Sequence, residues 1–512
     1  MLTQTDGKGQ VTIFGYNSRS LAVRKVDNGG SLEETYAYYA DGSMRRKTDR
    51  NGVLSEYTYD IHGRLTQEVA GESPISYTYD SNGNQLNITD ATGVTTRTYD
   101  ALNRVITKTV PVLGATTFVY DITAGLTSGY TGETTTDPKG NMVTRIYDKA
   151  GRLYQVKDGA AVMAAYTYYD NGNLQKMQYN GSSEEYTYYP NNRLHTLANK
   201  KGSTIIEAYN YSYDPAGNQT GKLDGKGTTS YSYDPLNRLL SVTEPGGEIT
   251  SYTYDAAGNR AAETVTAGGV SVTTGYAYDG LNRLVNTEKA LADGSTEVVS
   301  YTYDNNGNML SQLHSTIAAD AGLTPALGLY QLGVDSPAAD AIYEYDTRNQ
   351  LIKVSQGSHI VECTYNGEGL RVSKTVDGQT LRYLYEYDKI ILEINGAGNE
   401  TAHNVYGTNL VSRTAAGETL YYMYNGHGDV TALLDNAGTI RAGYYYDAFG
   451  SVLEHTGMDS NVTYAGYQYD KETGLYYLNS RMYDPGIARF LQEDTCGEDM
   501  GTVLVSENSI SA

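Results

Sequence analysis

Residues with the reactivity needed for catalysis are sparse in this chain of 512 residues. The seven histidines form neither an HExxH motif nor a His-x-His pair, so a zinc site of the metalloprotease type is not predicted. The chain has neither a Gly-x-Ser-x-Gly nucleophile elbow nor a phosphate-binding glycine loop. Its two cysteines, Cys363 and Cys496, are too few for a disulfide framework. We therefore expect neither a small-molecule enzyme nor a cofactor.

Acidic residues are abundant, and several aspartates stand in Asp-x-x-Gly-Asn segments such as residues 304–308. These segments resemble calcium loops, because carboxylate and amide oxygens are calcium ligands. An EF-hand loop, however, needs Gly at its sixth position and Glu at its twelfth, whereas Gly307 is the fourth residue here. Turn formation is the better interpretation, and we predict no metal site.

The acidic segments belong to a repeat. Tyr-Asp pairs recur at Asp60, Asp80 and Asp100 with a spacing of 20 residues, and each Asp is followed by two variable residues and then Gly or Asn. Self-similarity at a near-constant period is typical of repeat architectures. The predicted turn residues are Asp60 and Gly63, Asp80 and Gly83, Asp214 and Gly217, Asp255 and Gly258, and Asp304 and Gly307.

The repeat unit predicts a β-hairpin. Tyr57-Thr58-Tyr59 alternates two rings with a β-branched residue, which places both rings on one face of a strand. Asp60 opens a turn by bonding to the backbone ahead of it, and Gly63 adopts the left-handed conformation at the end of the turn. Two strands of about six residues and two turns of about four account for the period of ~20 residues. The prediction is an all-β fold, an antiparallel meander wound into a curved or spiralling sheet.

The composition agrees with many strands and many turns, because the chain has 51 Tyr and 56 Gly but 4 Phe and no Trp. A disordered chain would be poor in aromatic residues. The formal net charge of −22 argues against nucleic-acid binding, which requires an excess of Lys and Arg. The chain contains no apolar run of ~18 residues, so no membrane span is predicted. The first residues do not resemble a signal peptide.

The C-terminal third carries a more specific pattern. Residues 469–494 read Tyr-Asp-x-x-Thr-Gly-Leu-Tyr-Tyr, then Tyr-Asp-Pro, then Arg-Phe. With the Tyr-Asp repeats, this block resembles the RHS/YD-repeat proteins and their RHS repeat-associated core domain, over about residues 36–494. The resemblance implies a hollow β-cocoon that encloses a C-terminal toxin or effector. It also implies a secreted, cell-surface or cell-wall-associated component of a bacterial polymorphic toxin.

This resemblance and the spacing of the repeats suggest a division of the chain. We expect a lead-in or degenerate repeat at 1–35, YD repeats at 36–315, an insertion loop at 316–340 and further YD-like repeats at 341–415. The core domain is expected at 416–494, followed by a short tail outside the family pattern at 495–512. Because a cargo of 18 residues is too short to fold, we expect the toxin domain to be absent from this chain.

The family position of Asp484 and Asp494 implies a candidate catalytic pair. In several members the core domain acts like an aspartic protease and cuts the effector from the shell. Such hydrolysis needs one ionised and one protonated carboxyl group, with Arg481 or Arg489 to hold the geometry or an oxyanion. The alternative is that Asp484 and Pro485 form another turn and that Arg489 pairs with a neighbouring carboxylate.

Three functions remain open at this point. The first is a non-enzymatic shell that encloses a toxin or effector cargo, with further RHS repeats as another partner. The second is a repeat protein that binds carbohydrate, including cell-surface glycans, through its tyrosine rings. The third is a self-cleaving, aspartic-protease-like core, which is the only enzyme activity that we expect. The alternative to glycan binding is that the tyrosines fill one face of the sheet.

Overall fold

The computed structural model describes residues 2–27, 30, 32–319 and 339–493. These residues form 45 strands and one short 3-10 helix, η1 (Tyr464–Gly466), so the all-β prediction is confirmed. Residues 320–338 of the expected insertion loop and the whole tail 495–512 lie outside the described residues. None of the described residues forms a helix long and apolar enough to cross a membrane.

The described chain divides into two compact units. Unit 1 contains residues within 2–74, 229–361 and 490–493, and unit 2 contains residues 75–228 and 362–489. The strands of unit 1 are β1 (Leu2–Thr5), β2 (Val11–Tyr16), β3 (Ala22–Val26), β4 (Glu33–Tyr38), β5 (Met44–Thr48), β6 (Leu54–Tyr59), β7 (Leu65–Ala70), β23 (Leu239–Thr243), β24 (Ile249–Tyr254), β25 (Arg260–Ala267), β26 (Val270–Tyr278), β27 (Leu284–Ala290), β28 (Thr296–Tyr303), β29 (Met309–Ile317), β30 (Ala341–Tyr345) and β31 (Leu351–Gln356).

Unit 2 holds most of the remaining strands. They are β9 (Gln85–Asp90), β10 (Gly93–Tyr99), β11 (Val105–Val110), β12 (Gly114–Ile122), β13 (Thr131–Thr136), β14 (Met142–Tyr147), β15 (Leu153–Asp158), β16 (Ala161–Tyr168), β17 (Leu174–Tyr179), β18 (Ser182–Tyr188), β19 (Leu194–Lys201), β20 (Thr204–Tyr213), β21 (Gln219–Asp224), β33 (Arg371–Val376), β34 (Gln379–Glu386), β35 (Lys389–Asn395), β36 (Glu400–Tyr406), β37 (Leu410–Ala415), β38 (Glu418–Tyr424), β39 (Val430–Leu434), β40 (Ile440–Tyr446), β41 (Val452–Gly457), β42 (Gln468–Asp470), β43 (Leu475–Leu478) and β44 (Arg481–Asp484). The unit boundaries fall within β8 (Ser73–Tyr79), β22 (Gly227–Tyr233), β32 (His359–Tyr365) and β45 (Arg489–Phe490).

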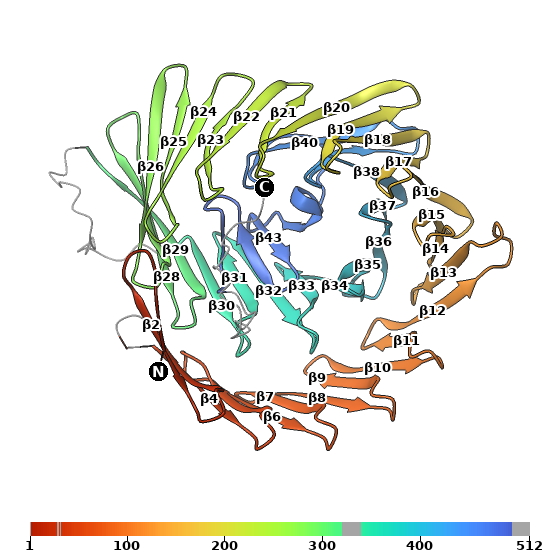
Figure 1. The fold of residues 1–512 in the computed structure, drawn as a ribbon, viewed down its shortest axis with the longest axis horizontal. Helices are drawn as coiled ribbons and strands as arrows, with labels where there is room; N and C mark the ends of the chain where they lie inside the picture. Colours follow the sequence, from red (N-terminus) through yellow and green to blue (C-terminus); the bar gives the residue numbers. More distant parts are fainter. Residues whose placement is uncertain (1, 28–29, 31, 320–338, 494–512) are drawn as a thin grey trace. The chain divides into compact units, whose positions relative to one another are not determined.

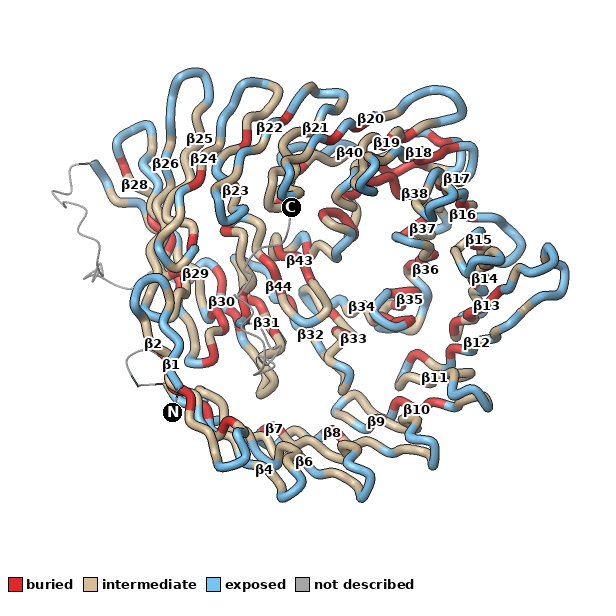
Figure 2. Tube along the Cα trace, viewed as in Figure 1, coloured by how far each residue is buried: buried red, intermediate tan, exposed pale blue. Residues whose placement is uncertain are grey.

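The topology is a meander. Strands β1 to β41 belong to one sheet of 41 strands, in which neighbours along the chain pair antiparallel and most are joined by short hairpins (Figure 1). Strands β42 to β45 form a second sheet of four strands. Buried residues lie mainly within strands, whereas exposed residues concentrate at the ends of the hairpins (Figure 2).

The Tyr-Asp turns share one hydrogen-bonding pattern, which Asp60 illustrates. Its backbone N–H donates to the Arg64 carbonyl at 2.9 Å, and the Gly63 N–H donates to the Asp60 carbonyl at 3.0 Å. The Asp60 Oδ1 accepts the N–H groups of His62 and Arg64 at 2.8 and 3.0 Å. Gly63 has φ +78°, a conformation that few residues other than glycine adopt without strain. The same two backbone bonds close the turns at Asp80 and Gly83, Asp214 and Gly217, Asp255 and Gly258, and Asp304 and Gly307.

Successive turns are also joined through asparagine side chains. The Asn84 amide donates to the Asp80 carboxylate and to the Asn103 side-chain oxygen, both at 2.8 Å. Asn103 occupies the fourth position of the next turn, with φ 61°. Equivalent bonds connect Asn173 to Asn192, Asn259 to Asn282, and Asn308 to Asn349. In each case the asparagine of a Gly-Asn turn donates its side-chain N–H to the asparagine of an Asn-Arg or Asn-Gln turn, so the two turn types are complementary.

A β-bulge accompanies the tyrosine before the turn in many hairpins. In the β8–β9 hairpin, Thr78 is opposite Asn87 but Tyr79 is opposite Gln85, so β9 contains one additional residue. A bulge interrupts the hydrogen-bond ladder and increases the local twist of the strands. The carbonyl group of Gln85, beside this interruption, accepts the Tyr99 hydroxyl of the neighbouring strand at 2.7 Å.

This tyrosine bond is a regular feature of the sheet. In each case a hydroxyl donates to the carbonyl group of the first residue of the preceding strand. The pairs are Tyr99 and Gln85, Tyr120 and Val105, Tyr168 and Leu153, Tyr254 and Leu239, Tyr278 and Arg260, Tyr303 and Leu284, Tyr385 and Arg371, Tyr424 and Leu410, and Tyr446 and Val430. Phenylalanine would supply the same ring but no donor. This difference gives a physical reason for 51 Tyr against 4 Phe.

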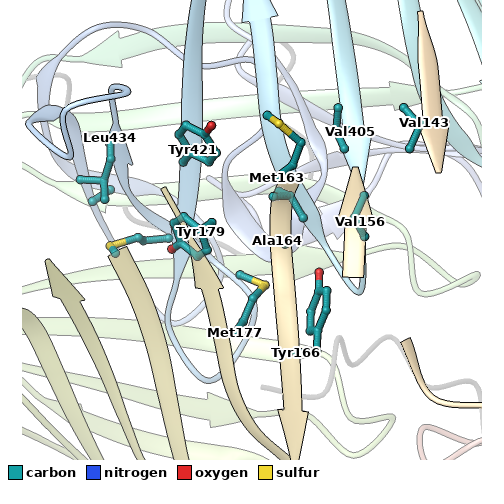
Figure 3. Close-up of a cluster of buried hydrophobic side chains, with 13 residues drawn as sticks. Val143, Val156, Met163, Ala164, Tyr166, Met177, Tyr179, Val405, Tyr421 and Leu434 are labelled. Carbon is teal, nitrogen blue, oxygen red and sulfur yellow. The ribbon is translucent and has the colours of Figure 1, made fainter. Parts of the chain in front are cut away.

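Segments far apart in the sequence pack together within each unit. In unit 1, the Thr347 hydroxyl donates to the Ala70 carbonyl at 3.1 Å, and Arg348 pairs with Glu68 at 3.2 Å. In unit 2, a hydrophobic cluster joins β14–β17 to β36–β39 (Figure 3). Within this cluster the Tyr179 and Tyr421 rings stack with their centroids 5.8 Å apart. The distant segments are therefore held by both apolar packing and specific polar contacts.

The tyrosine bond is tested by removing one hydroxyl. Tyr254→Phe leaves the carbonyl group of the buried Leu239 without the donor at 2.7 Å. We expect a loss of about 1–2 kcal/mol in the free energy of unfolding, measured as a lower denaturation midpoint. Tyr154→Phe is the control, because Tyr154 is 37% exposed and keeps its edge-on ring contact with Tyr130. Equal effects of the two substitutions would contradict the proposed role of the hydroxyl.

Candidate functional site

The four-stranded sheet at the end of the described chain carries three of the four predicted catalytic residues. Arg481 and Asp484 are the first and last residues of β44, and Arg489 begins β45. In the pairing of β43 with β44, Leu478 is opposite Arg481 and Tyr476 is opposite Tyr483. Both arginines are half-buried. The structure thus places Arg481, Asp484 and Arg489 in one small sheet.

Asp484 lies in a turn and in an environment that changes its acidity. Its Oδ1 accepts the Gly486 backbone N–H at 2.8 Å. Burial raises the pKa of Asp484 to about 6, although the N–H groups of Gly486 and Ile487 oppose this change. A carboxyl group with such a pKa can hold a proton in weakly acid solution, as a general acid must. Asp494, its predicted partner, lies outside the described residues, so the catalytic pair remains a prediction.

The small sheet and the preceding 3-10 helix η1 are joined to the β40–β41 turn by tyrosine hydroxyl groups. Three successive carbonyl groups of this turn each accept one hydroxyl: Ala448 from Tyr464 at 3.4 Å, Phe449 from Tyr483 at 2.8 Å, and Gly450 from Tyr476 at 3.0 Å. In addition, the Ser451 hydroxyl donates to the Pro485 carbonyl at 3.3 Å. The Asp484-Pro485 turn is therefore positioned against the β40–β41 turn by several polar contacts.

A buried ionic cluster connects the small sheet to β33. The Asp470 carboxylate binds the guanidinium group of Arg371, and it also lies 2.9 Å from the Lys374 ammonium group. The Arg371 side chain is fully buried, and its guanidinium carbon lies 4.2 Å from the centre of the Tyr477 ring. Burial alone would raise the pKa of Asp470, but Arg371 and Lys374 hold it below its usual value. Removal of one partner would leave a buried charge without compensation, which is strongly destabilising.

A second buried carboxyl group, Glu184, joins β17 and β18 to β38. Its Oε1 accepts the Tyr424 backbone N–H at 3.2 Å and the Tyr179 hydroxyl at 3.3 Å. Its Oε2 accepts the Tyr186 hydroxyl at 2.5 Å. Glu184 is 1% exposed, and burial raises its pKa to about 7. Its donors are neutral groups, whereas Asp470 has two cations, and this difference explains the opposite pKa shifts.

Sequence reasoning identified neither of these clusters. Asp470 was recognised only as part of a Tyr-Asp motif, and Arg371 lies 99 positions away from it. Glu184 stands in the polar run Ser182-Ser183-Glu184-Glu185, which gives no sign of burial. Within the described ranges, no group of three or more His, Cys, Asp and Glu side chains is arranged to hold a metal ion.

The repeated hairpins and the C-terminal core together define a YD-repeat shell protein. The chain belongs to the teneurin YD-shell family, whose model matches residues 43–110 and 261–507, more than half of the chain. The RHS repeat model matches residues 213–249 and 233–271. The resemblance to RHS/YD-repeat proteins is thereby confirmed.

Two curated relatives are bacterial nucleases. The tRNA3(Ser)-specific nuclease WapA of Bacillus spizizenii is 36% identical over 205 residues, which are 38% of this chain and 8% of that protein. The tRNA nuclease WapA of Bacillus subtilis is 34% identical over 205 residues, with the same two shares. The match thus spans less than a tenth of the length of these relatives.

A solved structure shares the fold. The crystal structure of TcdB2-TccC3 matches 97% of this chain and 30% of its own chain, with a TM-score of 0.66 and 18% sequence identity. The all-β YD-shell fold class predicted for this chain is thereby confirmed.

Glu184 predicts a specific dependence of stability on pH. Because its pKa is raised from 4.5 to about 7 by folding, the folded state binds more protons between these values, and stability falls as pH rises through this range. Relative to Glu184→Gln, we expect the wild type to lose roughly 3 kcal/mol between pH 4.5 and pH 8. Denaturant titrations of both proteins across this range measure the difference.

Glu185→Gln is the matched control, because Glu185 is the sequence neighbour of Glu184 but is 37% exposed. It pairs with Lys200 and Lys176. These hydrogen bonds and charges lower the pKa of Glu185, so its small contribution is lost as pH falls, the opposite direction. A constant difference between wild type and Glu184→Gln at all pH values would contradict the assignment.

Proposed function

We propose that this chain is the structural shell of a bacterial polymorphic toxin and encloses a toxin or effector cargo outside its own sequence. The observation that carries the proposal is the match of 97% of the chain to the TcdB2-TccC3 structure. The similarity to the WapA nucleases and, at 27% identity over 141 residues, to a double-stranded DNA deaminase toxin of Burkholderia cenocepacia supports an association with toxins. In this proposal the protein is secreted or attached to the surface of a bacterial cell.

The construction of the sheet supports a structural role. The tyrosine hydroxyls, the asparagine bonds between turns and the buried ionic clusters each join neighbouring or distant strands. In a repeat protein the units contact mainly their neighbours. Additional bonds between distant strands therefore help to define a single folded arrangement. We propose residues 36–315 and 341–415 as the repeat wall and 416–494 as the core that ends it.

The shell function is tested with a probe cargo. A small ribonuclease domain fused after Ala512 is expected to be digested by an added protease at least about tenfold more slowly than the free domain, because enclosed chain is cleaved only when the shell opens. The same domain fused before Met1 serves as the control and is expected to be digested at the rate of the free domain. Equal digestion of the two fusions would overturn the proposal.

A second function is favoured by the raised pKa of Asp484. We propose that the core cleaves its own chain, with Asp484 as the protonated acid, Asp494 as the ionised base that activates water, and Arg481 or Arg489 as a positioning residue. Since the pKa of Asp484 is about 6, the protonated form dominates below this value and is lost as pH rises above it.

Self-cleavage is tested by intact-mass measurement of the purified chain at pH 5 and pH 8. We expect a shortened product that forms faster at pH 5 and is absent from Asp484→Asn and Asp494→Ala. Asp459→Asn, at a side chain that is 65% exposed, is expected to cleave like the wild type. Identical masses for the wild type and Asp494→Ala at both pH values would reject self-cleavage in this chain.

A further inference from the structure

The last described residues of the chain are attached to unit 1. The Met309 backbone N–H donates to the Leu491 carbonyl at 2.9 Å. Leu491 is fully buried and Gln492 is 4% exposed, although they follow a strand at the very end of the described chain. Residues 491–493 are therefore held in place by specific contacts.

Arg50 is the centre of the attachment. Its side chain is 8% exposed and its guanidinium group binds the Glu493 carboxylate. The same group lies 2.9 Å from Asp27 and 3.4 Å from Glu34, and it donates to the Asn306 carbonyl at 2.8 Å. A planar guanidinium group with several donors can satisfy such a set of acceptors, which a lysine could not. Glu493 supplies a third carboxylate to this cation.

The backbone that carries Arg50 is fixed by a reciprocal pair of turns. The Asn306 amide donates to the Asp49 carboxylate at 2.7 Å, and the Asn51 amide donates to the Asp304 carboxylate at 3.0 Å. These bonds lie on both sides of Arg50 in the sequence. The guanidinium group is thus presented by a prearranged structure, so that little conformational freedom is lost when Glu493 binds.

Gly307 provides the space that Glu493 occupies. A Cβ atom on Gly307 would lie 3.0 Å from the Glu493 Oε2 and 3.5 Å from its Cβ atom. Gly63 stands at the same position of another Tyr-Asp turn and also has a positive φ, but a Cβ atom there would have no neighbour within 4 Å. Both positions require a positive φ, but only Gly307 must also leave space for a neighbouring side chain. Comparing alanine substitutions at the two glycines therefore distinguishes the effect of the backbone conformation from the effect of the lost space.

We propose that Arg50, with the turns at 49–52 and 304–307, forms a docking site for the chain's own segment 491–493. The site determines where the chain that follows residue 493 starts. Asp494, the predicted base, is the first residue after this anchor, and a cargo connected in sequence would be tethered to it. The docking site requires neither self-cleavage nor a cargo, so it goes beyond the proposed function.

Hydrogen exchange of the 512-residue chain tests the docking site. We expect Glu493→Gln and Gly307→Ala each to accelerate amide exchange in residues 490–493 by about tenfold, because exchange reports local opening. Gly63→Ala has a similar backbone penalty and is expected to leave exchange in this segment at the wild-type rate. Arg50→Met should release the segment as well, but it also removes the cation that pairs with Asp27 and leaves Glu34 with Lys47 alone, so Glu493→Gln is the decisive variant.

Two results would overturn the docking site. One is wild-type exchange in residues 490–493 of Glu493→Gln. The other is the same exchange rate in Gly307→Ala and Gly63→Ala, which would show that only the backbone conformation matters. Denaturation midpoints of all variants show whether a faster rate is local, because global destabilisation accelerates exchange throughout the chain. The readout does not depend on cleavage or cargo, so failure of the proposed function would leave this result unaffected.

Discussion

The hydrogen bond from a tyrosine hydroxyl to the first carbonyl group of the preceding strand is the interaction on which the sheet depends. A bulge beside the turn interrupts the ladder, as at Tyr79 and Gln85, and a polar backbone group there needs another partner. The hydroxyl of the neighbouring strand, here Tyr99, supplies it. The bulge increases the twist of the hairpin. The tyrosine hydroxyl supplies a hydrogen bond to the carbonyl group beside the bulge, so the twisted hairpin does not leave this group without a partner. Repetition of the pair along the chain therefore gives many hairpins of the meander the same local geometry.

Buried polar groups add what the repeat itself does not provide. Neighbouring hairpins are alike, so their local bonds do not determine which distant hairpins pack together. Arg371 with Asp470, Glu184 with Tyr424, and Arg50 with Glu493 are contacts between segments far apart in the sequence and are not part of the hairpin repeat. A buried charged group that loses its partner strongly destabilises the fold. Any other arrangement of the distant hairpins would separate these partners and is therefore disfavoured. The same clusters create the unusual acidities of Glu184 and Asp470.

Much of the local structure could be predicted because its causes lie within a few residues. The alternation of Tyr57, Thr58 and Tyr59 predicts a strand, and Asp60 is bonded within its own turn, four residues or fewer away. The candidate residues Arg481, Asp484 and Arg489 were also located by a local motif. The pKa of Asp484 could not be predicted, because it depends on burial by surrounding residues. Arg50 was not recognised at all, since Glu493 follows it by 443 positions.

The sequence by itself determined the all-β class, the hairpin period, the turn residues and the family, because each rests on short-range spacing. It also showed the excess of tyrosine over phenylalanine, but not its reason. The tertiary structure decided which hydroxyl meets which carbonyl group, which carboxyl groups are buried, and where residues 491–493 are held. These features arise from contacts between strands and between distant segments. Solvent exclusion and hydrogen-bond geometry exist only once those segments have packed.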